Sequence, residues 1–430
     1  MTLTDRDLVE RYGSPLYVYD LDRVAAARDD LMAALPDGFT LYYSLKANPH
    51  PGLVRALREG ERPCRAEVCS TGELAAAVEA GHAPETILYS GPGKTSDELT
   101  DALTRGVRTF SVESPGDLRR LGATAVRHGV EARVLIRVNA TDAAATTSIR
   151  MTGTASQFGF DAETLPGVLP ELREVEGVRV LGAHFFPLSN SRDEDSLIAE
   201  FTATIATAAA LEAELGLPLD VLDIGGGFGA PYSVPGERPV YAGLRAALEK
   251  ALDTHLPRWR DGGLEIACES GRHLVGDSGR LLTSVTNVKH SRGKTFAILD
   301  AGINTLGGMA GLGRLLPLAV EPVAGGAGGA GGAGGVGGVG GVGGAGTETA
   351  VSLAGPLCTP GDLLARSARL PVPAPGDVLA VPNVGAYGLT ASLTHFLGRP
   401  APTEVLVRGG EVVSATRLTS SRVAIDSGAK

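Results

Sequence analysis

The 430-residue sequence has little that would tie it to a membrane, to nucleic acid or to a disulfide framework. Its four cysteines, Cys64, Cys69, Cys268 and Cys358, include no CxxC pair, so neither a zinc site nor a disulfide scaffold is indicated. Reduced thiols in a cytoplasm fit this usage better. The net charge of −10 argues against nucleic acid as a partner. We therefore expect an acidic, soluble, cytoplasmic protein without a bound metal.

Long apolar runs are also scarce. The N-terminal stretch MTLTDRDLVERYG is charged and lacks the apolar core of a signal peptide. Only the glycine-rich run at 324–346 has the length of a membrane span, and its glycines and alanines are too weakly apolar to insert. This run repeats in threes without proline, which excludes collagen and is typical of a flexible linker or a disordered surface insertion. We expect no membrane partner and no catalytic role for this insertion.

The chain is longer than one compact core usually holds, so two domains are expected. From residue 39 onward, short β-rich runs alternate with helical patterns. Eight strands are predicted, at 39–45, 65–69, 86–90, 109–113, 132–138, 178–186, 220–224 and 264–268. Eight strands alternating with helices favour an α/β fold, a parallel (β/α)8 TIM barrel, with a doubly wound sheet as the fallback.

After about residue 275 the strand-like runs carry no long helices between them, which predicts an all-β domain, a sandwich or a barrel. The run SPLYVYD at 14–20 is also strand-like. The predicted organisation is therefore an N-terminal strand region (1–22) joining the β-domain, a barrel (23–275), and a C-terminal β-domain (276–430) with the glycine-rich insertion.

Polar and glycine residues recur where the predicted strands end, which is the rim where TIM barrels carry catalytic groups. Lys46 ends the first strand, in YYSLKANP. An arbitrary strand-end lysine is usually a surface residue, but at this rim it is also a candidate nucleophilic amine that forms a Schiff base with a carbonyl. The seventh strand runs into GGGFG (225–229), where backbone amides approach an anion closely, although any tight turn favours glycine.

Glu269 ends the eighth strand and is followed by Ser270, Gly271 and Arg272. A carboxylate beside the pyridine nitrogen of pyridoxal 5′-phosphate (PLP) keeps that nitrogen protonated, which makes the ring a strong electron sink. The plain alternative is a strand-end glutamate paired with Arg272.

The chain resembles the fold-type III PLP-dependent decarboxylases, the group that holds diaminopimelate, ornithine and arginine decarboxylases. The matching stretches occur in the family's order and cover nearly the whole chain: GSPLYVYD, YYSLKANP, EVCSTGELAAAVEAG, ILYSGPGKTSDEL, FSVESPGDL, LDIGGGFG, ESGRHLVGDSG, GPLCTPGD and GAYG. The resemblance implies a PLP-binding barrel of the alanine-racemase type, a C-terminal β-domain, and a homodimer with active sites at the subunit interface.

Carried over residue by residue, the resemblance implies that Lys46 binds PLP covalently, that Glu269 faces the ring nitrogen, and that Arg137 lies near the ring. It places six residues around the phosphate: Ser189, Gly226, Gly227, Gly271, Arg272 and Tyr387. Cys358, contributed by the second subunit, would help to deliver a proton to Cα after CO2 leaves. Its alternative role is that of a small buried hydrophobe.

Four departures from the family pattern bear on the substrate. Phe186 stands where a histidine usually stacks on the PLP ring; a phenyl ring can still stack but cannot donate a proton. Gln157-Phe158-Gly159 replaces Lys-Phe-Gly, and Thr359 replaces the acidic residue after the cysteine, leaving Asp362 as the candidate substrate-binding carboxylate. The segment 300–320 replaces an Arg-Pro-x-Leu-Tyr stretch that helps to hold a substrate carboxylate.

At these positions the sequence is similar to decarboxylases of specialised biosynthesis. One of these enzymes acts on glutamate tethered to an acyl carrier protein. We expect decarboxylation at Cα of an amino acid in specialised metabolism, free or carrier-bound. The alternatives are a diaminopimelate decarboxylase of lysine synthesis and a non-catalytic paralogue that binds protein partners. An amino-acid racemase is disfavoured, because that family places an arginine at the pyridine nitrogen.

Overall fold

The computed structural model describes residues 3–140, 155–307, 320–324 and 347–424. The chain divides into two compact units. The sheet unit comprises Met1–Asp22, Tyr232–Gly236 and Ser278–Lys430, and the barrel unit comprises Arg23–Pro231 and Glu237–Asp277. Residues 325–346 of the glycine-rich insertion lie outside the described residues. So do residues 308–319 of the segment 300–320, which departs from the family pattern.

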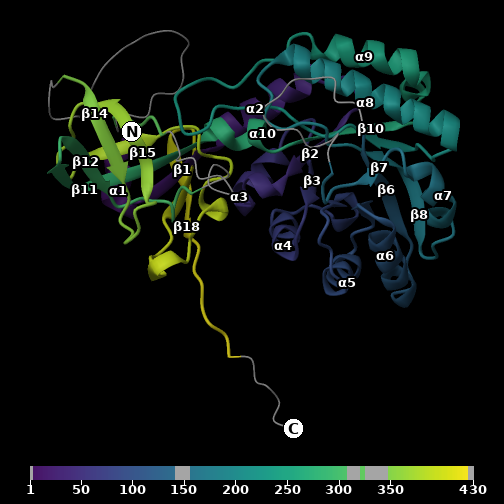
Figure 1. The fold of residues 1–430 in the computed structure, drawn as a ribbon, viewed down its shortest axis with the longest axis horizontal. Coiled ribbons are helices and arrows are strands. Elements are labelled where there is room, and N and C mark those ends of the chain that lie inside the picture. The colour runs from purple at the N-terminus through teal and green to yellow at the C-terminus, as the bar shows by residue number, and fades with distance from the viewer. Residues whose placement is uncertain (1–2, 141–154, 308–319, 325–346, 425–430) are drawn as a thin grey trace. The chain divides into compact units, whose positions relative to one another are not determined.

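The barrel unit is a closed ring of eight parallel strands, which confirms the TIM-barrel prediction (Figure 1). The hydrogen-bonded order is β5-β4-β3-β2-β10-β9-β8-β6, and pairing of β5 with β6 closes the ring. The strands are β2 (Thr40–Ser44), β3 (Arg65–Val68), β4 (Leu88–Tyr89), β5 (Thr109–Val112), β6 (Ala132–Asn139), β8 (Val178–His184), β9 (Val221–Asp223) and β10 (Glu265–Ser270). A short strand, β7 (Phe160–Asp161), adds to the outer side of this ring by pairing with β6.

Several of the helices that follow the strands begin at a capping residue. Ser70 and Ser114 accept hydrogen bonds from the third residue beyond them, and Thr95 forms a capping box with Glu98. The helices of the barrel are α2 (Leu21–Ala34), α3 (Pro51–Leu57), α4 (Thr71–Glu79), α5 (Ser96–Arg105), α6 (Pro115–Arg127), α7 (Leu165–Arg173), α8 (Glu194–Leu215), α9 (Leu244–His255) and α10 (Arg272–Val275). Figure 1 shows α4, α5 and α6 along one side of the barrel and α8 and α9 along the other.

Helix α8 is long and apolar enough, by length and composition alone, to cross a membrane. The sequence analysis identified only the glycine-rich run as long enough for a membrane span. It connects β8 to β9 and buries Leu197, Phe201 and Ile205. These positions recur at intervals of four residues, so its apolarity is that of a helix packed on one face against a barrel.

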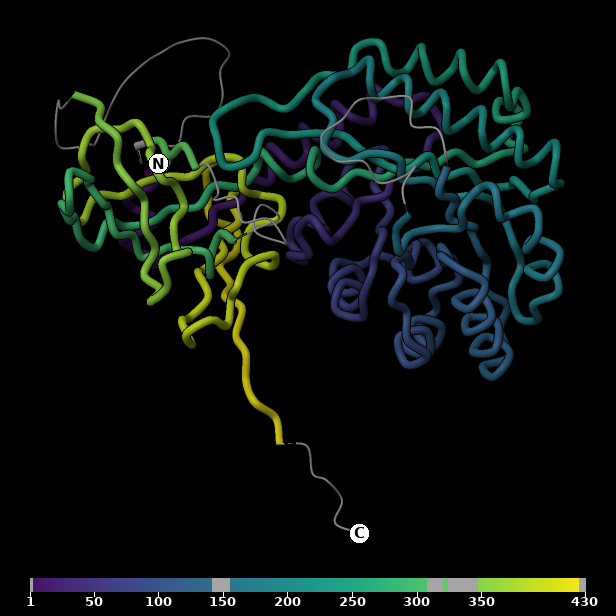
Figure 2. The backbone as a smooth tube through the Cα atoms, viewed as in Figure 1, coloured from purple at the N-terminus to yellow at the C-terminus, as the bar shows by residue number. Residues whose placement is uncertain are grey.

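The sheet unit draws strands from both ends of the chain. Its elements are α1 (Asp5–Tyr12), β1 (Leu16–Asp20), β11 (Gly279–Ser291), β12 (Lys294–Leu299), β13 (Val323–Ala324), β14 (Thr349–Ala354), β15 (Leu363–Leu370), β16 (Val378–Val381), β17 (Thr403–Arg408) and β18 (Glu411–Arg417). Strand β1 lies between β11 and β17, which Figure 2 shows as a purple segment among green and yellow ones. Its core packs Leu16 and Val18 against Leu282 and Val405.

Candidate active site

Lys46 lies directly after β2, in a single 3-10 turn (Leu45–Ala47) whose other two residues are buried. Its side chain is 38% exposed, and its Nζ lies 3.5 Å from Oε2 of Glu67, which belongs to the neighbouring strand β3. The apolar neighbours anchor the turn and leave the amine at the C-terminal rim of the barrel, where TIM barrels carry their chemistry. The predicted nucleophile is therefore placed where a bound substrate or cofactor can reach it.

Glu67 is a site residue that the sequence analysis missed. Its side chain is 1% exposed, and its carboxylate accepts hydrogen bonds from the Ser90 hydroxyl and from the Cys69 thiol at 3.1 Å. Burial raises the pKa of Glu67, but the Lys46 ammonium and these hydrogen bonds outweigh it and bring the pKa to about 2. A permanent anion therefore faces the Lys46 amine. The one sign of Glu67 in the sequence is a carboxylate in the middle of the strand-like run RAEVC (65–69).

The Phe186 ring is approached by two cations. Lys46 Nζ lies 5.0 Å from the ring centroid, and the Arg137 guanidinium carbon lies 5.8 Å from it. Arg137 also stacks on Phe158, at 4.7 Å from that ring centroid. Cation–π contacts of this length are attractive, and they strengthen where water is excluded. Phe186 therefore contacts Lys46 and Arg137 through the face of its ring.

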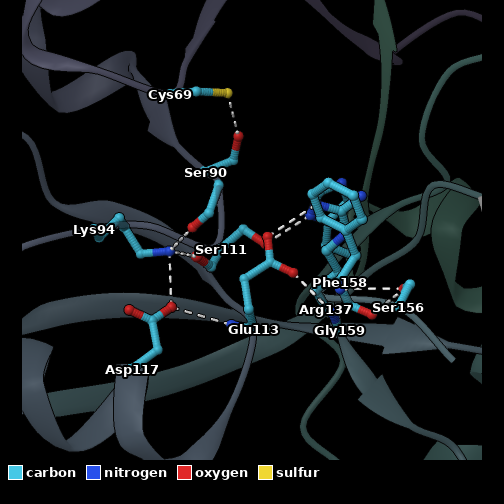
Figure 3. A network of polar contacts seen from close by, with 12 residues as sticks. Cys69, Ser90, Lys94, Ser111, Glu113, Asp117, Arg137, Ser156, Phe158 and Gly159 are labelled. Atoms are coloured by element: carbon cyan, nitrogen blue, oxygen red, sulfur yellow. Dashed lines mark hydrogen bonds and ion pairs between the residues drawn. The ribbon is translucent and has the colours of Figure 1, made fainter. Parts of the chain in front are cut away.

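Glu113, directly after β5, contacts both Arg137 and the backbone of Gly159 (Figure 3). Its Oε1 lies 2.9 Å from Arg137 Nη1, and its Oε2 accepts the Gly159 N–H at 2.8 Å. Both side chains of the pair are nearly buried, at 10% for Arg137 and 3% for Glu113. One carboxylate thus fixes both the arginine and the loop that carries Phe158.

A second buried ion pair supports Glu113. Lys94 is 1% exposed on its side chain, and its Nζ lies 2.8 Å from Asp117 Oδ2 and donates to the Ser111 carbonyl at 2.9 Å. The same Asp117 oxygen accepts the Glu113 N–H at 3.1 Å (Figure 3). A buried lysine is tolerated only when it is paired and hydrogen-bonded, and both conditions hold here. Lys94, Asp117 and Glu113 were not among the predicted site residues.

Glu269 lies at the end of β10, with 1% of its side chain exposed, and faces His184 at the end of β8. Its Oε1 lies 3.2 Å from His184 Nε2, while His184 Nδ1 shares a 2.7 Å hydrogen bond with the Ser111 hydroxyl. Burial lowers the pKa of His184, but the Glu269 carboxylate outweighs that effect and the net change is upward. Glu269 is therefore held by a histidine and not by Arg272.

Asp223, at the end of β9, completes this cluster. One oxygen each from Asp223 and Glu269 and one nitrogen of His184 lie within 4.8 Å of one another. Asp223 is fully buried, and burial together with the Glu269 charge raises its pKa to about 7. Its Oδ1 accepts the Gly225 N–H at 2.9 Å, so the aspartate also shapes the start of the glycine loop.

The glycine loop after β9 is crowded where a side chain would stand. Gly225 adopts φ +79°, and a Cβ there would overlap the Phe185 carbonyl oxygen. A Cβ on Gly226 would lie 2.6 Å from the Glu269 carbonyl oxygen and 3.2 Å from the Phe186 ring. A Cβ on Gly227 would likewise overlap Leu188. The loop backbone therefore lies directly against the segment that carries Phe186, as a cofactor cradle without side chains requires.

The remaining predicted phosphate ligands of the barrel unit lie on the two adjacent segments. Ser189 precedes Ser191, whose N–H donates to the Gly227 carbonyl at 2.8 Å. Gly271 and Arg272 follow Glu269 at the start of α10, and a Cβ on Gly271 would lie 2.8 Å from the Ala47 side chain. The structure thus brings the Lys46 turn, the glycine loop and the end of β10 together at one rim.

Three predicted site residues belong to the sheet unit. Cys358 is exposed, and Tyr387 adopts φ +53° and accepts the Tyr232 hydroxyl on its carbonyl at 2.9 Å. Asp362 is 3% exposed, and its two carboxylate oxygens accept the N–H groups of Ile303 (2.8 Å) and Leu357 (2.7 Å). These bonds brace the turn that carries Cys358; a substrate contact by Asp362 stays a prediction.

The barrel site fits PLP by its own chemistry. A reactive amine stands at the rim, a side-chain-free loop lies beside it, and the buried Glu269 Oε1 and His184 Nε2 lack an aligned hydrogen bond among the described residues. A buried carboxylate without a hydrogen-bond donor is costly, and the protonated nitrogen of a pyridine ring would supply one. Fold and site together define a PLP-dependent barrel enzyme.

Comparison with known proteins identifies the family of this enzyme. Residues 21–276 match the family described as pyridoxal-dependent decarboxylase, pyridoxal binding domain, and the chain belongs to that family. It is 32% identical over 412 residues to the L-glutamyl-[BtrI acyl-carrier protein] decarboxylase of Niallia circulans, covering 94% of this chain and 91% of that one. It is 34% identical over 414 residues to the diaminopimelate decarboxylase of Deinococcus radiodurans, covering 94% and 93%.

The solved structures agree. A point mutant of the diaminopimelate decarboxylase of Helicobacter pylori, complexed with L-lysine, superposes with a TM-score of 0.79 at 26% identity, covering 96% of this chain and 95% of that one. The protein is therefore a PLP-dependent amino acid decarboxylase with a TIM barrel and a separate β-domain, as the motifs indicated.

Proposed function

We propose that Lys46 binds PLP covalently and that the buried Glu269 carboxylate faces its ring nitrogen. Arg137 and Phe186 would flank the ring. The phosphate ligands would be Ser189, Gly226, Gly227, Gly271, Arg272 and Tyr387. Two observations support this proposal. The barrel residues of the set lie at the same rim, and the buried Oε1 of Glu269 has no hydrogen-bond donor among the described residues. Bound PLP supplies an electron sink for the pair of electrons left at Cα when CO2 departs.

The chain's own residues prepare this step. The Glu67 anion stabilises positive charge on the Lys46 nitrogen, 3.5 Å away, so this nitrogen can hold a proton whenever it is released from the cofactor. His184, 3.2 Å from Glu269 and hydrogen-bonded to Ser111, orients the Glu269 carboxylate. Cys358, on the turn braced by Asp362, would return a proton to Cα.

For the substrate we propose glutamate tethered to an acyl carrier protein. The Niallia circulans relative acts on such a substrate, and Thr359 replaces an acidic residue that would meet the distal amine of a free diamino acid. Because decarboxylation needs a free α-carboxylate and α-amine, the tether must use the side-chain carboxyl. A site for this substrate needs no charged clamp at the distal end.

A second candidate substrate is free diaminopimelate, favoured by relatives such as the Deinococcus radiodurans enzyme. A CO2-release assay with added PLP decides between them. It compares carrier-loaded glutamate with free diaminopimelate, ornithine, lysine, arginine and glutamate, and Lys46→Ala serves as the blank. We expect turnover on the loaded carrier alone. Turnover of free diaminopimelate at roughly 1 to 1000 per second would return the protein to lysine synthesis.

We also propose that the enzyme works as a homodimer in which Cys358 of one subunit serves the Lys46 site of the other. Lys46→Ala and Cys358→Ala would then each be inactive alone. Mixed and reassociated, they would recover about a quarter of the wild-type rate, because half of the random dimers are mixed and each carries one intact site. No recovery from a mixture that is dimeric by sedimentation would contradict a shared site.

A further inference from the structure

A cavity of about 740 Å³ opens at the end of the barrel opposite to Lys46. It is lined by the residues that begin two strands, Thr40 of β2 and Arg65 of β3, and by Thr86, which precedes β4. Strand β2 therefore runs from this cavity to the Lys46 turn. The volume suits a small organic ligand, and its place at the N-terminal ends of the strands separates it from the catalytic rim.

Two arginines bring positive charge to the cavity without full neutralisation. Arg58 Nη1 donates to the Ala80 carbonyl at 2.9 Å, and Arg62 donates to the carbonyls of Met32 (2.8 Å) and Pro36 (3.3 Å). Backbone carbonyls fix a guanidinium in place but leave its charge. Within the described part of the chain no carboxylate pairs with Arg58, although the whole protein carries a net charge of −10.

The nearby carboxylates are already engaged. Glu265 pairs with the third cavity arginine, Arg65, at 2.8 Å. Asp37 lines the cavity, but its side chain is 88% exposed; it lies 3.7 Å from Arg62 and makes the shorter contact, 3.1 Å, with Arg245. The cavity therefore keeps an excess of positive charge, held on two guanidinium groups with unused N–H donors.

His82 adds a further polar side chain to the cavity wall. It is 6% exposed and lines the cavity, yet its imidazole makes no hydrogen bond to any described residue. Burial and the Arg58 charge lower the pKa of His82 to about 4, so at neutral pH it offers one N–H donor and one acceptor. A ligand oxygen inside the cavity would accept that N–H.

The chain makes room for this arrangement at Gly81, next to His82. Gly81 has φ +91°, and a Cβ there would lie 2.5 Å from Arg58 Nη1. The glycine lets the Arg58 side chain lie across the C-terminal end of α4.

We propose that this cavity binds a small organic oxyanion, a phosphate monoester or a carboxylate, with its charged group against Arg58, Arg62 and His82. Its apolar part would lie against Phe39 and Pro63, which line the same cavity. Guanidinium groups bind both oxyanions through paired hydrogen bonds, so the geometry defines the charged group and the experiment separates the two classes.

The test is equilibrium dialysis of the PLP-loaded enzyme against radiolabelled inorganic phosphate and, separately, radiolabelled citrate, at fixed ionic strength. The test variant is Arg58→Gln combined with Arg62→Gln. The matched control is Arg55→Gln, because Arg55 lies one turn earlier on α3 and donates to the next carbonyl of α4, that of Glu79, at 3.2 Å, yet does not line the cavity. Thermal unfolding verifies that both variants are folded.

We expect one saturable site per chain for at least one probe, weakened about tenfold or more in the double variant and unchanged in Arg55→Gln. Phosphate binding alone would assign a phosphate monoester, and citrate binding alone a carboxylate. The single tryptophan, Trp259, packs edge-on against Phe39 with ring centroids 6.4 Å apart, so its fluorescence gives a second readout. Absence of saturable binding of either probe up to about 10 mM, or equal binding by the double variant, would overturn the proposal.

Discussion

Glu113 holds Arg137 and the Gly159 backbone at the same time, with 2.9 Å to the guanidinium and 2.8 Å to the amide nitrogen. The arginine in turn lies between the rings of Phe158 and Phe186. A residue that touches neither Lys46 nor Glu269 thereby sets the position of the ring beside the nucleophile.

Glu113→Gln should destabilise the fold strongly, because it leaves the nearly buried Arg137 charge without a counterion. We expect a loss of ~3 kcal/mol in the free energy of unfolding, measured by urea titration. The matched control is Glu171→Gln, which breaks the pair with Arg119 that is 55% exposed on both sides and should cost less than ~1 kcal/mol. Equal losses in the two variants would show that Glu113 carries no special load.

Phe186→Leu should weaken retention of PLP, because it removes the ring face that Lys46 and Arg137 approach. Each cation–π contact contributes about 0.5 to 2 kcal/mol, so we expect cofactor loss on dialysis to become roughly tenfold faster. Phe186→Tyr keeps the ring and should behave like the wild type. The measurement is the decay of the bound-cofactor absorbance, and a leucine variant that holds PLP as long as the wild type contradicts the stacking role.

Glu269→Gln should reduce CO2 release by roughly 100-fold or more while PLP stays bound, because a neutral amide cannot keep a pyridine nitrogen protonated. Glu265→Gln, at the other end of the same strand, is the control and should leave the rate within a few-fold of the wild type. Turnover and cofactor absorbance are measured on the same samples. Near-wild-type turnover by Glu269→Gln would remove Glu269 from the reaction.

Glu404→Gln should stabilise the protein at alkaline pH. Glu404 of the sheet unit is 4% exposed and accepts the Tyr19 hydroxyl at 3.0 Å, and its burial raises its pKa to about 7. The folded state therefore holds a proton that the unfolded state releases above about pH 4.5. The wild type thus loses stability as pH rises from there to about 7.

The amide keeps the hydrogen-bond acceptor and carries no charge to bury. The gain of Glu404→Gln over the wild type should be small at pH 5 and approach ~3 kcal/mol at pH 8, as measured by urea unfolding. Glu411→Gln, at an exposed position of β18, should show no comparable change between the two pH values. A gain for Glu404→Gln that is largest at pH 5 would contradict the assignment.

The strand pattern was enough to predict the barrel, because eight short β-rich runs alternate with helical patterns along the chain. It also predicted which residues meet at the rim, since parallel strands end on one side. It did not predict the partners of those residues. Glu67, Glu113 and His184 act through contacts between residues on different strands, and spacing along one segment carries no sign of them.

Two features of the structure could not be derived from composition or from distance along the chain, for the same reason. Glu269 faces His184, although Arg272 is its nearest basic residue in sequence, because the rim brings β8 and β10 together across β9. Helix α8 matches the composition of a membrane span, because a helix packed on a barrel also needs a broad apolar face. Composition alone does not record which neighbour covers that face.

The position of β1 has a consequence for synthesis on the ribosome. Its register pairs Leu16 with Leu282 on one side and with Thr403 on the other, so the first strand made waits for nearly the last. All eight strands of the barrel, by contrast, are present once residue 270 has left the exit tunnel. The barrel can close while β1 still presents two unpaired edges, a state in which strands join foreign chains readily. Pairing of β1 with β17, rather than closure of the barrel, therefore ends the period in which β1 has an unpaired edge.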